Sequence, residues 1–188
     1  LVEKIFSMDA AWAFTVAALL WVYLGIQKGQ VTQDGLTGLN NRRRLDQYMW
    51  ELDERSGERE TCCYLLMDVN KFKKVNDTYG HVTGDEVLRL VAEQLKRTFG
   101  NMQAFLARYG GDEFVVIVKG KTQDEMDVII HQTQENVNAI AWGADTPWQL
   151  SISIGCAMRG EQGKQKSHEL LALADERMYR QKKGIQDR

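Results

Sequence analysis

A continuous apolar run constrains the fold more than any other segment of this sequence. Residues 61–69, TCCYLLMDV, are apolar apart from Thr61 and Asp68. A strand that faces solvent on one side alternates apolar with polar residues, whereas an uninterrupted apolar run fits a strand that is buried on both faces. The sequence therefore predicts such a strand here, with the carboxylate of Asp68 near its end.

Patterns typical of helices and strands alternate along the rest of the chain. Asn40 or Asn41 can cap the first helix, Thr122 and Glu125 form a capping box, and Ser167 and Gly184 bound the last helix. The order of elements after the first helix predicts an α+β fold with a ferredoxin-like β-α-β-β-α-β core. We expect helices over residues 40–58, 85–99, 122–140 and 167–184, and strands over 61–69, 104–109, 113–119 and 148–158.

The composition is that of a globular domain with a short appendage. The 188 residues are 44% hydrophobic and 27% charged, which suffices for a well-formed core. The net charge of −2 provides no basic field, so we expect no nucleic-acid partner. The cysteines, Cys62, Cys63 and Cys156, match neither a disulfide framework nor a metal-ligand spacing, and we expect them to be reduced.

The N-terminal segment differs from the body. Residues 10–26 carry no charge, and Trp12, Trp21 and Tyr23 lie near the ends of this stretch. We predict a membrane-spanning or linker helix within residues 1–30, followed by one domain over residues 31–188, in a fragment of a longer chain. The alternative is a buried linker or dimerisation helix of a soluble protein. The basic residues that follow favour a cytoplasmic body.

Two adjacent acids, Asp112 and Glu113, follow a glycine pair in the sequence ARYGGDEF. By itself this pattern is also typical of a hairpin turn with a solvated tip. In the ferredoxin-like plan, however, the first strand and the hairpin lie side by side. Asp68 is then expected close to Asp112 and Glu113.

Three clustered carboxylates repel one another unless a cation neutralises them. The usual cation is a hard divalent ion with oxygen ligands, Mg²⁺ or a relative such as Mn²⁺, which shares its shell with water and substrate phosphates. Two such ions, about 4 Å apart, activate an attacking oxygen and stabilise a leaving group. The acids therefore indicate phosphoryl chemistry.

The segment after Asp68 supplies further candidates. Backbone N–H groups at Lys71, Phe72 and Lys73 can hold phosphate oxygens, and the Lys73 side chain can add positive charge, although a solvated basic face is the alternative. Asp85 can accept hydrogen bonds from the N1 and N2 groups of guanine, and Asn76 offers both donor and acceptor atoms. The alternatives are a helix cap for Asp85 and an ordinary turn position for Asn76.

Four spaced blocks, DGLTGLNNRR (34–43), MDVNKFKKVNDTYGHVTGDEVL (67–88), RYGGDEF (108–114) and ADERMYRQKKG (174–184), resemble the GGDEF diguanylate cyclase family. The resemblance implies a nucleotide-cyclase palm fold that condenses two GTP into cyclic di-GMP and two pyrophosphates in a homodimer. It also implies two Mg²⁺ or Mn²⁺ ions per site and, with the N-terminal segment, a location at the bacterial inner membrane. The alternative function is a catalytically silent module that binds GTP or cyclic di-GMP.

The resemblance assigns roles residue by residue. Asp68, the carbonyl of Val69, Asp112 and Glu113 match the metal site, and Asp112 also matches the proton acceptor. Lys73 matches the residue that stabilises transition-state charge. His81, taken alone, is more typical of a packing or capping residue. The expected substrate-binding residues are Lys71, Phe72, Asn76, His81, Asp85 and Lys182.

The sequence departs from the family pattern in three places. Asn70 replaces an acid, the late block KKGIQ lacks an arginine after Gly184, and Asn101 and Ala104 replace the two charged residues of the RxxD product-inhibition motif. Without the arginine and the acid, that inhibitory site lacks its charged anchors. We therefore expect weak or no product feedback through it.

Overall fold

The computed structural model describes residues 12–22, 32–55, 61–141, 149–159 and 165–186. It divides into two compact units, Leu1–Thr32 and Gln33–Arg188. In the first unit, residues 12–22 are helical and their side chains are exposed. The other residues of the expected helix lie outside the described part. Among the residues that are described, no helix has both the length and the apolar character needed to cross a bilayer. The membrane location stays a prediction from sequence.

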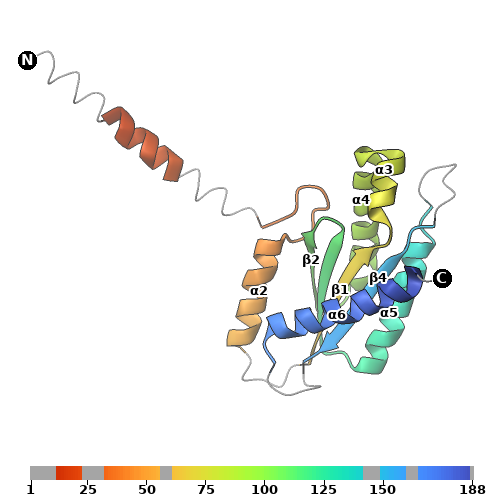
Figure 1. The fold of residues 1–188 in the computed structure, drawn as a ribbon. Coiled ribbons are helices and arrows are strands. Elements are labelled where there is room, and N and C mark those ends of the chain that lie inside the picture. Colours follow the sequence, from red (N-terminus) through yellow and green to blue (C-terminus); the bar gives the residue numbers. More distant parts are fainter. Residues whose placement is uncertain (1–11, 23–31, 56–60, 142–148, 160–164, 187–188) are drawn as a thin grey trace, which may run out of the picture. The chain divides into compact units, whose positions relative to one another are not determined.

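The second unit contains a four-stranded antiparallel sheet in the order β2-β3-β1-β4 (Figure 1). Two helices connect β1 to β2, a hairpin joins β2 to β3, and one helix connects β3 to β4. This arrangement agrees with the β-α-β-β-α-β order expected from sequence. The elements are α2 (Arg42–Glu54), β1 (Cys62–Val69), α3 (Phe72–Tyr79), α4 (His81–Phe99), β2 (Ala104–Gly110), β3 (Glu113–Lys119), α5 (Gln123–Asn138), β4 (Ile152–Met158) and α6 (Ser167–Gln186).

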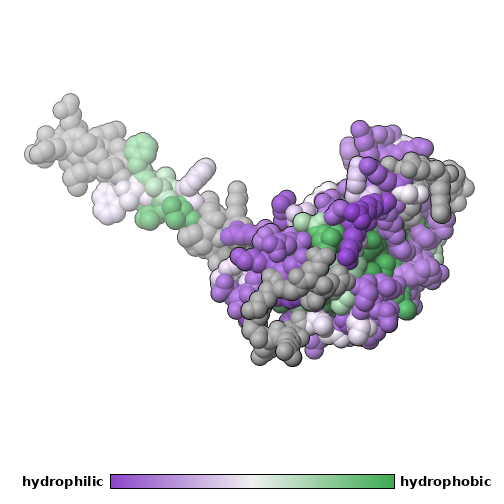
Figure 2. Space-filling view, turned by 60° about the horizontal axis from the view of Figure 1, so that its bottom comes forward, coloured by the Kyte–Doolittle hydropathy of each residue, from purple (hydrophilic) through white to green (hydrophobic). Residues whose placement is uncertain are grey.

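Helices cover both faces of the sheet (Figure 1). One core contains Cys63, Leu65 and Met67 of β1 together with the apolar stripes of α4 and α5. The other contains Tyr64 and Leu66 with the buried residues of α2 and α6. All of β1 is buried, as its continuous apolar run predicts. Hydrophilic side chains cover most of the visible surface of this unit, with apolar areas between them (Figure 2).

Two predicted helix starts are correct because their caps are local in sequence. Asn41 accepts a hydrogen bond from the N–H of Arg44 at the start of α2, and Leu45 lies in the core as expected. Thr122 and Glu125 form the expected capping box of α5. These side-chain-to-backbone contacts span three residues, so the sequence alone specifies them.

The prediction was wrong between β1 and α4. The helix expected over residues 85–99 begins earlier, because the turn-rich stretch NDTYGHVTGD (76–85) belongs to α3 and to a helix α4 that begins at His81, four residues before Asp85. Gly80 makes the corner between the two helices with φ of 82°, a conformation open mainly to glycine. Burial of Val75 and Gly84 shows that packing overrides the turn preference of the sequence.

Gly184 does not end α6, which continues to Gln186. A glycine inside a helix costs only about 1 kcal/mol relative to alanine, so it does not stop a helix by itself. The last strand is also shorter than predicted, because β4 begins at Ile152 and not at residue 148.

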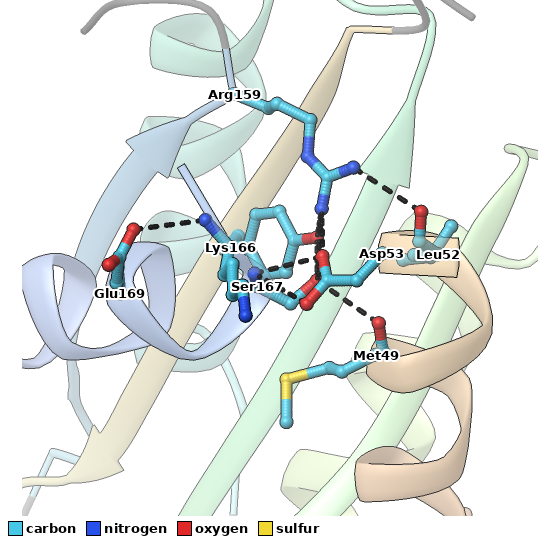
Figure 3. Close-up of polar contacts among 8 residues, drawn as sticks. Met49, Leu52, Asp53, Arg159, Lys166, Ser167 and Glu169 are labelled. Atoms are coloured by element: carbon cyan, nitrogen blue, oxygen red, sulfur yellow. Dashed lines mark hydrogen bonds and ion pairs between the residues drawn. The ribbon is translucent and has the colours of Figure 1, made fainter. Parts of the chain in front are cut away.

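A partly buried polar cluster joins the end of α2 to the start of α6 (Figure 3). Asp53 accepts hydrogen bonds from the N–H of Ser167, at 3.0 and 3.1 Å, and from Nη2 of Arg159, at 2.7 Å. Arg159 also donates to the hydroxyl of Tyr64, at 3.0 Å. Burial raises the pKa of Tyr64 to about 12, so its hydroxyl stays protonated and available as a donor. Asp53 therefore caps a helix that begins 114 residues later in the chain.

Side chains from two helices cover the outer edge of β4. Gln134 of α5 donates to the carbonyl of Ile152, Arg177 of α6 donates to the carbonyl of Cys156, and Gln181 accepts from the N–H of Ile154. An edge strand with open backbone groups is prone to pair with other chains. These contacts satisfy part of that edge without another strand.

Helix α6 approaches β4 most closely at Gly155. A Cβ atom at this position would collide with the carbonyl oxygen of Ala174 and the backbone nitrogen of Met178. Because both obstacles are backbone atoms of α6, rotation of a side chain cannot relieve the collision.

We expect Gly155→Ala to lower the free energy of unfolding by about 1–3 kcal/mol or more, since overpacking forces the helix away from the sheet. Urea unfolding measures this. Gly184→Ala is the matched control, because it lies in α6 with open space around it and alanine favours a helix. Equal stability of the Gly155 variant and the control would contradict the close packing.

Candidate active site

Strand pairing places three acids at one end of the sheet. In the register between β1 and β3, Asp68 lies opposite Glu113, and the N–H of Val69 donates to the carbonyl of Asp112 at 3.2 Å. Residues opposite each other on antiparallel strands have Cβ atoms about 4.5–5.5 Å apart. Asp68, Asp112 and Glu113 are therefore neighbours in space although 44 residues separate the first two in the chain.

The turn that carries the acids has an irregular geometry. The register between β2 and β3 shifts between Arg108 and Gly110, and Gly111 has φ of 49°. Bulges of this kind redirect side chains near functional sites. The irregular turn delivers Asp112 and Glu113 to the end of β3 beside Asp68.

Arg108 links this turn to the start of the domain. Its Nε and Nη2 donate to the carbonyl of Gly111 at 3.0 and 2.7 Å, and its Nη1 contacts both carboxylate oxygens of Asp34 at 3.2 Å. Asp34 also accepts from the N–H and hydroxyl of Thr37. Burial raises the pKa of Asp34, but the hydrogen bonds from Thr37 and Arg108 outweigh it, so the pKa lies below its ordinary value.

The acids are electrostatically coupled. The pKa of Asp112 is raised, mainly by burial and next by the negative charge of Asp68. The pKa of Glu113 is also raised, mainly by burial and next by the charges of Asp68 and Asp112. The positive charge of Lys182 in α6 opposes both shifts, and its Nζ lies 2.6 Å from Oδ1 of Asp68. The side chain of Asp68 is only 8% exposed, whereas that of Lys182 is 28% exposed. The corner thus has excess negative charge that one lysine partly neutralises.

The donor atoms fit a divalent cation, although they do not form a complete cage. Among the described residues, no three acidic, histidine or cysteine side chains already converge as a metal site. Carboxylate and carbonyl oxygens are nevertheless the ligands of hard cations, and Mg²⁺ is usually held by one or two carboxylates with substrate phosphates and water. The coupled acids therefore fit an ion that arrives together with a phosphate-bearing ligand.

The turn after β1 lies at the same end of the sheet. Lys71 has φ of 57°, an uncommon conformation for a residue other than glycine, and α3 begins at Phe72. Lys71 and Lys73 are exposed, and Phe72 is partly buried. The N-terminus of α3 therefore lies close to the acids in the chain and can accept an anion.

The residues expected to contact the base lie where α3 meets α4. Asn76 is in α3 and not in a turn, and its Oδ1 is buried without a hydrogen-bond partner in the described part of the chain. Asp85 is exposed within α4, so it does not cap that helix. His81 is the exposed first residue of α4, which excludes the packing alternative.

Sequence patterns did not identify Asp34, Arg108 and Gly84 as residues that shape the site. A Cβ atom on Gly84 would collide with Oδ1 of Asn76 and would lie 3.0 Å from its Cγ and 3.2 Å from Cζ of Phe72. The spacing of Asp34 and Thr37 is a detectable local signal. The partner of Asp34, however, is 74 residues away, and no local pattern reveals such a contact.

Residues 31–188 match the family model described as diguanylate cyclase, GGDEF domain. The chain belongs to the GGDEF diguanylate cyclase family. The family resemblance noted in the sequence is thus confirmed, and the three acids and Lys182 lie within the matched region.

Individual relatives agree with this assignment. The probable diguanylate cyclase DgcI of Escherichia coli (strain K12) is 38% identical over 156 residues, which are 80% of this chain and 31% of that protein. Diguanylate cyclase DosC of the same organism is 34% identical over 161 residues, 82% of this chain and 34% of that protein. The GGDEF domain described here thus spans well under half the length of either relative.

Solved structures show the same fold. The coiled coil and GGDEF domain of DgcB from Caulobacter crescentus, crystallised in complex with c-di-GMP, has a TM-score of 0.73 and 28% identity, covering 95% of each chain. The GGDEF domain of DgcB alone has a TM-score of 0.72 and 30% identity, covering 82% of this chain and 92% of that one.

Removing one of the coupled acids is expected to stabilise the domain. The pKa of Asp112 is raised, so its ionised form destabilises the folded state at pH values above the raised pKa. We expect Asp112→Asn to increase the free energy of unfolding near neutral pH by about 0.5–1 kcal/mol. The gain should vanish as the pH falls toward the ordinary value of 3.8, where the native carboxyl is also neutral.

Thermal unfolding across this pH range measures the effect, and Asp127→Asn, on the exposed face of α5, is the control. A destabilised Asp112 variant near neutral pH would show that repulsion among the acids is not significant.

Gly84 and Asn76 are expected to be coupled in stability. Gly84→Ala should destabilise the domain by about 1–3 kcal/mol, because the new methyl group displaces the Asn76 amide. In an Asn76→Ala background much of this obstacle is gone, and the helix preference for alanine should make the same change neutral or stabilising by up to about 1 kcal/mol. Urea unfolding of the double-mutant cycle measures the coupling. If the changes in unfolding free energy of the two single variants simply add in the double variant, Gly84 and Asn76 are not coupled.

Proposed function

We propose that this chain is the catalytic domain of a diguanylate cyclase. It condenses two GTP into cyclic di-GMP and two pyrophosphates, with the 3′-OH of one GTP attacking the α-phosphate of the other. The main support is the register that sets Asp68 opposite Glu113 beside Asp112, within a domain of this family. The relatives named as diguanylate cyclases support the same activity.

The acidic corner would hold the divalent ions. Asp68, Asp112, Glu113 and the carbonyl of Val69 are the proposed ligands of two Mg²⁺ or Mn²⁺ ions. Bound there, such ions lower the pKa of a hydroxyl and neutralise the charge of the phosphates. Asp112 is the proposed proton acceptor, because it would lie beside the hydroxyl that the ions activate.

The other residues would bind and orient GTP. The N–H groups at Lys71, Phe72 and Lys73 would contact phosphate oxygens, and the Lys73 side chain would stabilise transition-state charge. Asp85 would accept from N1 and N2 of guanine, which selects against adenine because adenine has no such donor pair. Asn76 and His81 would complete the nucleotide contacts.

Lys182 would exchange partners during binding. In the structure described here its ammonium group contacts the nearly buried Asp68 at 2.6 Å. With a divalent ion and a triphosphate bound, Asp68 would hold the ion and Lys182 would contact the phosphates. The partial exposure of Lys182 supports this movement, since a flexible four-carbon side chain can reorient without repacking the core.

Catalysis would require two copies of the domain. Each holds one GTP, and the two sites face each other, so neither copy alone completes both bonds of the cyclic product. Association of the domains then controls the rate. The c-di-GMP complex of DgcB supports recognition of the cyclic dinucleotide by this fold. Here Asn101 and Ala104 replace the RxxD charges, so we propose weak or no feedback through that site.

The alternative, a catalytically silent GTP- or cyclic di-GMP-binding module, belongs to a different functional class. No contact among the described residues favours it, and the signature acids are intact. Release of pyrophosphate from GTP separates the two functions.

We expect the protein, incubated with GTP and Mg²⁺, to produce cyclic di-GMP. Asp112→Asn should reduce the rate by more than about 100-fold, because even groups that only support a metal ligand contribute up to that factor. Chromatography of the product and a pyrophosphate assay measure both species. Asp127→Asn, a carboxylate change on the far helix α5, should retain the rate. Unchanged synthesis by the Asp112 variant would remove this residue from the mechanism.

A further inference from the structure

Two cysteine side chains lie close together on one face of the sheet, away from the acidic corner. Cys63 lies on β1 and Cys156 on β4, and their Sγ atoms are 2.9 Å apart. The register pairs Leu65 with Cys156 and Cys63 with Met158, so the two cysteines are diagonal neighbours on one face of the sheet. Both are present as thiols. We propose that Cys63 and Cys156 form an oxidation-sensitive pair that closes into a disulfide between β1 and β4.

The sulfur atoms are already close, and bond formation requires a movement of the two strands. The sulfur atoms of a disulfide are about 2.05 Å apart, so the two Sγ atoms must approach by less than about 1 Å. Cα atoms of diagonal residues on paired strands lie about 7–8 Å apart, and their Cβ atoms somewhat less. This exceeds the usual Cα separation of a disulfide, about 4.4–6.8 Å, so the backbones of β1 and β4 must move toward each other before the bond can form.

Cys62 provides an internal control. It precedes Cys63 directly but belongs to the other core, which contains α2 and α6. Successive side chains of a strand point to opposite faces. The sheet therefore separates Cys62 from Cys156. Cys62 is buried to a similar extent as Cys63 but cannot reach Cys156.

The two thiols differ in access, and this sets the order of reaction. Cys63 is fully buried on a central strand, whereas Cys156 is 9% exposed on β4, the last strand of the described sheet. Side chains of α5 and α6, and not another strand, contact the outer edge of β4. Local opening of an edge requires less disruption than opening of the sheet centre. Cys156 is therefore the thiol that reacts first with the oxidant.

The chemistry balances with hydrogen peroxide as the oxidant. The sulfur of Cys156 attacks one peroxide oxygen, the O–O bond breaks, and the products are a sulfenic acid and water. The sulfur of Cys63 then attacks the sulfenic sulfur, and the hydroxyl group leaves as a second water after taking the proton of Cys63. Two thiols lose two electrons and two protons, and one peroxide becomes two waters.

The disulfide would join residues 93 positions apart. Closing a long loop restricts the unfolded chain, so it stabilises the folded state when the native geometry accepts it. It also ties β1, which carries Asp68 near its end, to the strand that carries Gly155 against α6.

The test treats the full chain with hydrogen peroxide, blocks remaining thiols by alkylation and maps peptides without reduction. We expect one cross-link, Cys63–Cys156, with Cys62 alkylated. In Cys63→Ala, dimedone should label a sulfenic acid at Cys156, whereas Cys156→Ala should give no label at Cys63. A cross-link through Cys62, no cross-link in the folded wild type, or preferred labelling of Cys63 would overturn the proposal.

Stability provides a second measurement that does not depend on labelling. Peroxide should raise the urea midpoint of the wild type and of Cys62→Ala, and a thiol reductant should restore the original value. Cys63→Ala and Cys156→Ala should show no such reversible rise. An equal reversible rise in all four proteins, or none in the wild type, would contradict a disulfide between β1 and β4.

Discussion

The pairing of β1 with β3 is the constraint on which the site depends. Side chains of a strand alternate between faces, so a slip of one residue would move Asp68 away from Glu113 and also reverse the two cores. Because β1 is buried on both faces, such a slip would expose apolar side chains on each side at once. The hydrophobic cores thus fix the position of a carboxylate that contributes nothing to them.

The fold tolerates an unfavourable cluster of charge because the surrounding contacts are strong. The pKa shifts of Asp112 and Glu113 indicate that the acids disfavour one another's ionised forms. Lys182 neutralises part of this charge, and Arg108 fixes the turn through the carbonyl of Gly111. Functional sites commonly retain such groups at the expense of stability.

Sequence patterns predicted the elements whose signals are local. The apolar run of β1, the Asn41 cap and the capping box of α5 act over a few residues, and all three were correct. The predicted start of α4 was wrong, because residues that favour turns are packed there as helix. The predicted end of α6 at Gly184 was wrong, because a single glycine does not stop a helix. The family blocks identified the acids, whereas the Asp34–Arg108 ion pair depends on tertiary structure that no short pattern encodes.

The contacts of Asp53 join α2 and α6, the two helices on one face of the sheet. The carboxylate at the end of α2 holds the first turn of α6, and the opposite end of α6 carries the ammonium group that contacts Asp68. The Asp53 contacts therefore connect α2, which begins directly after Asn41, to the helix that carries Lys182 beside the acidic corner.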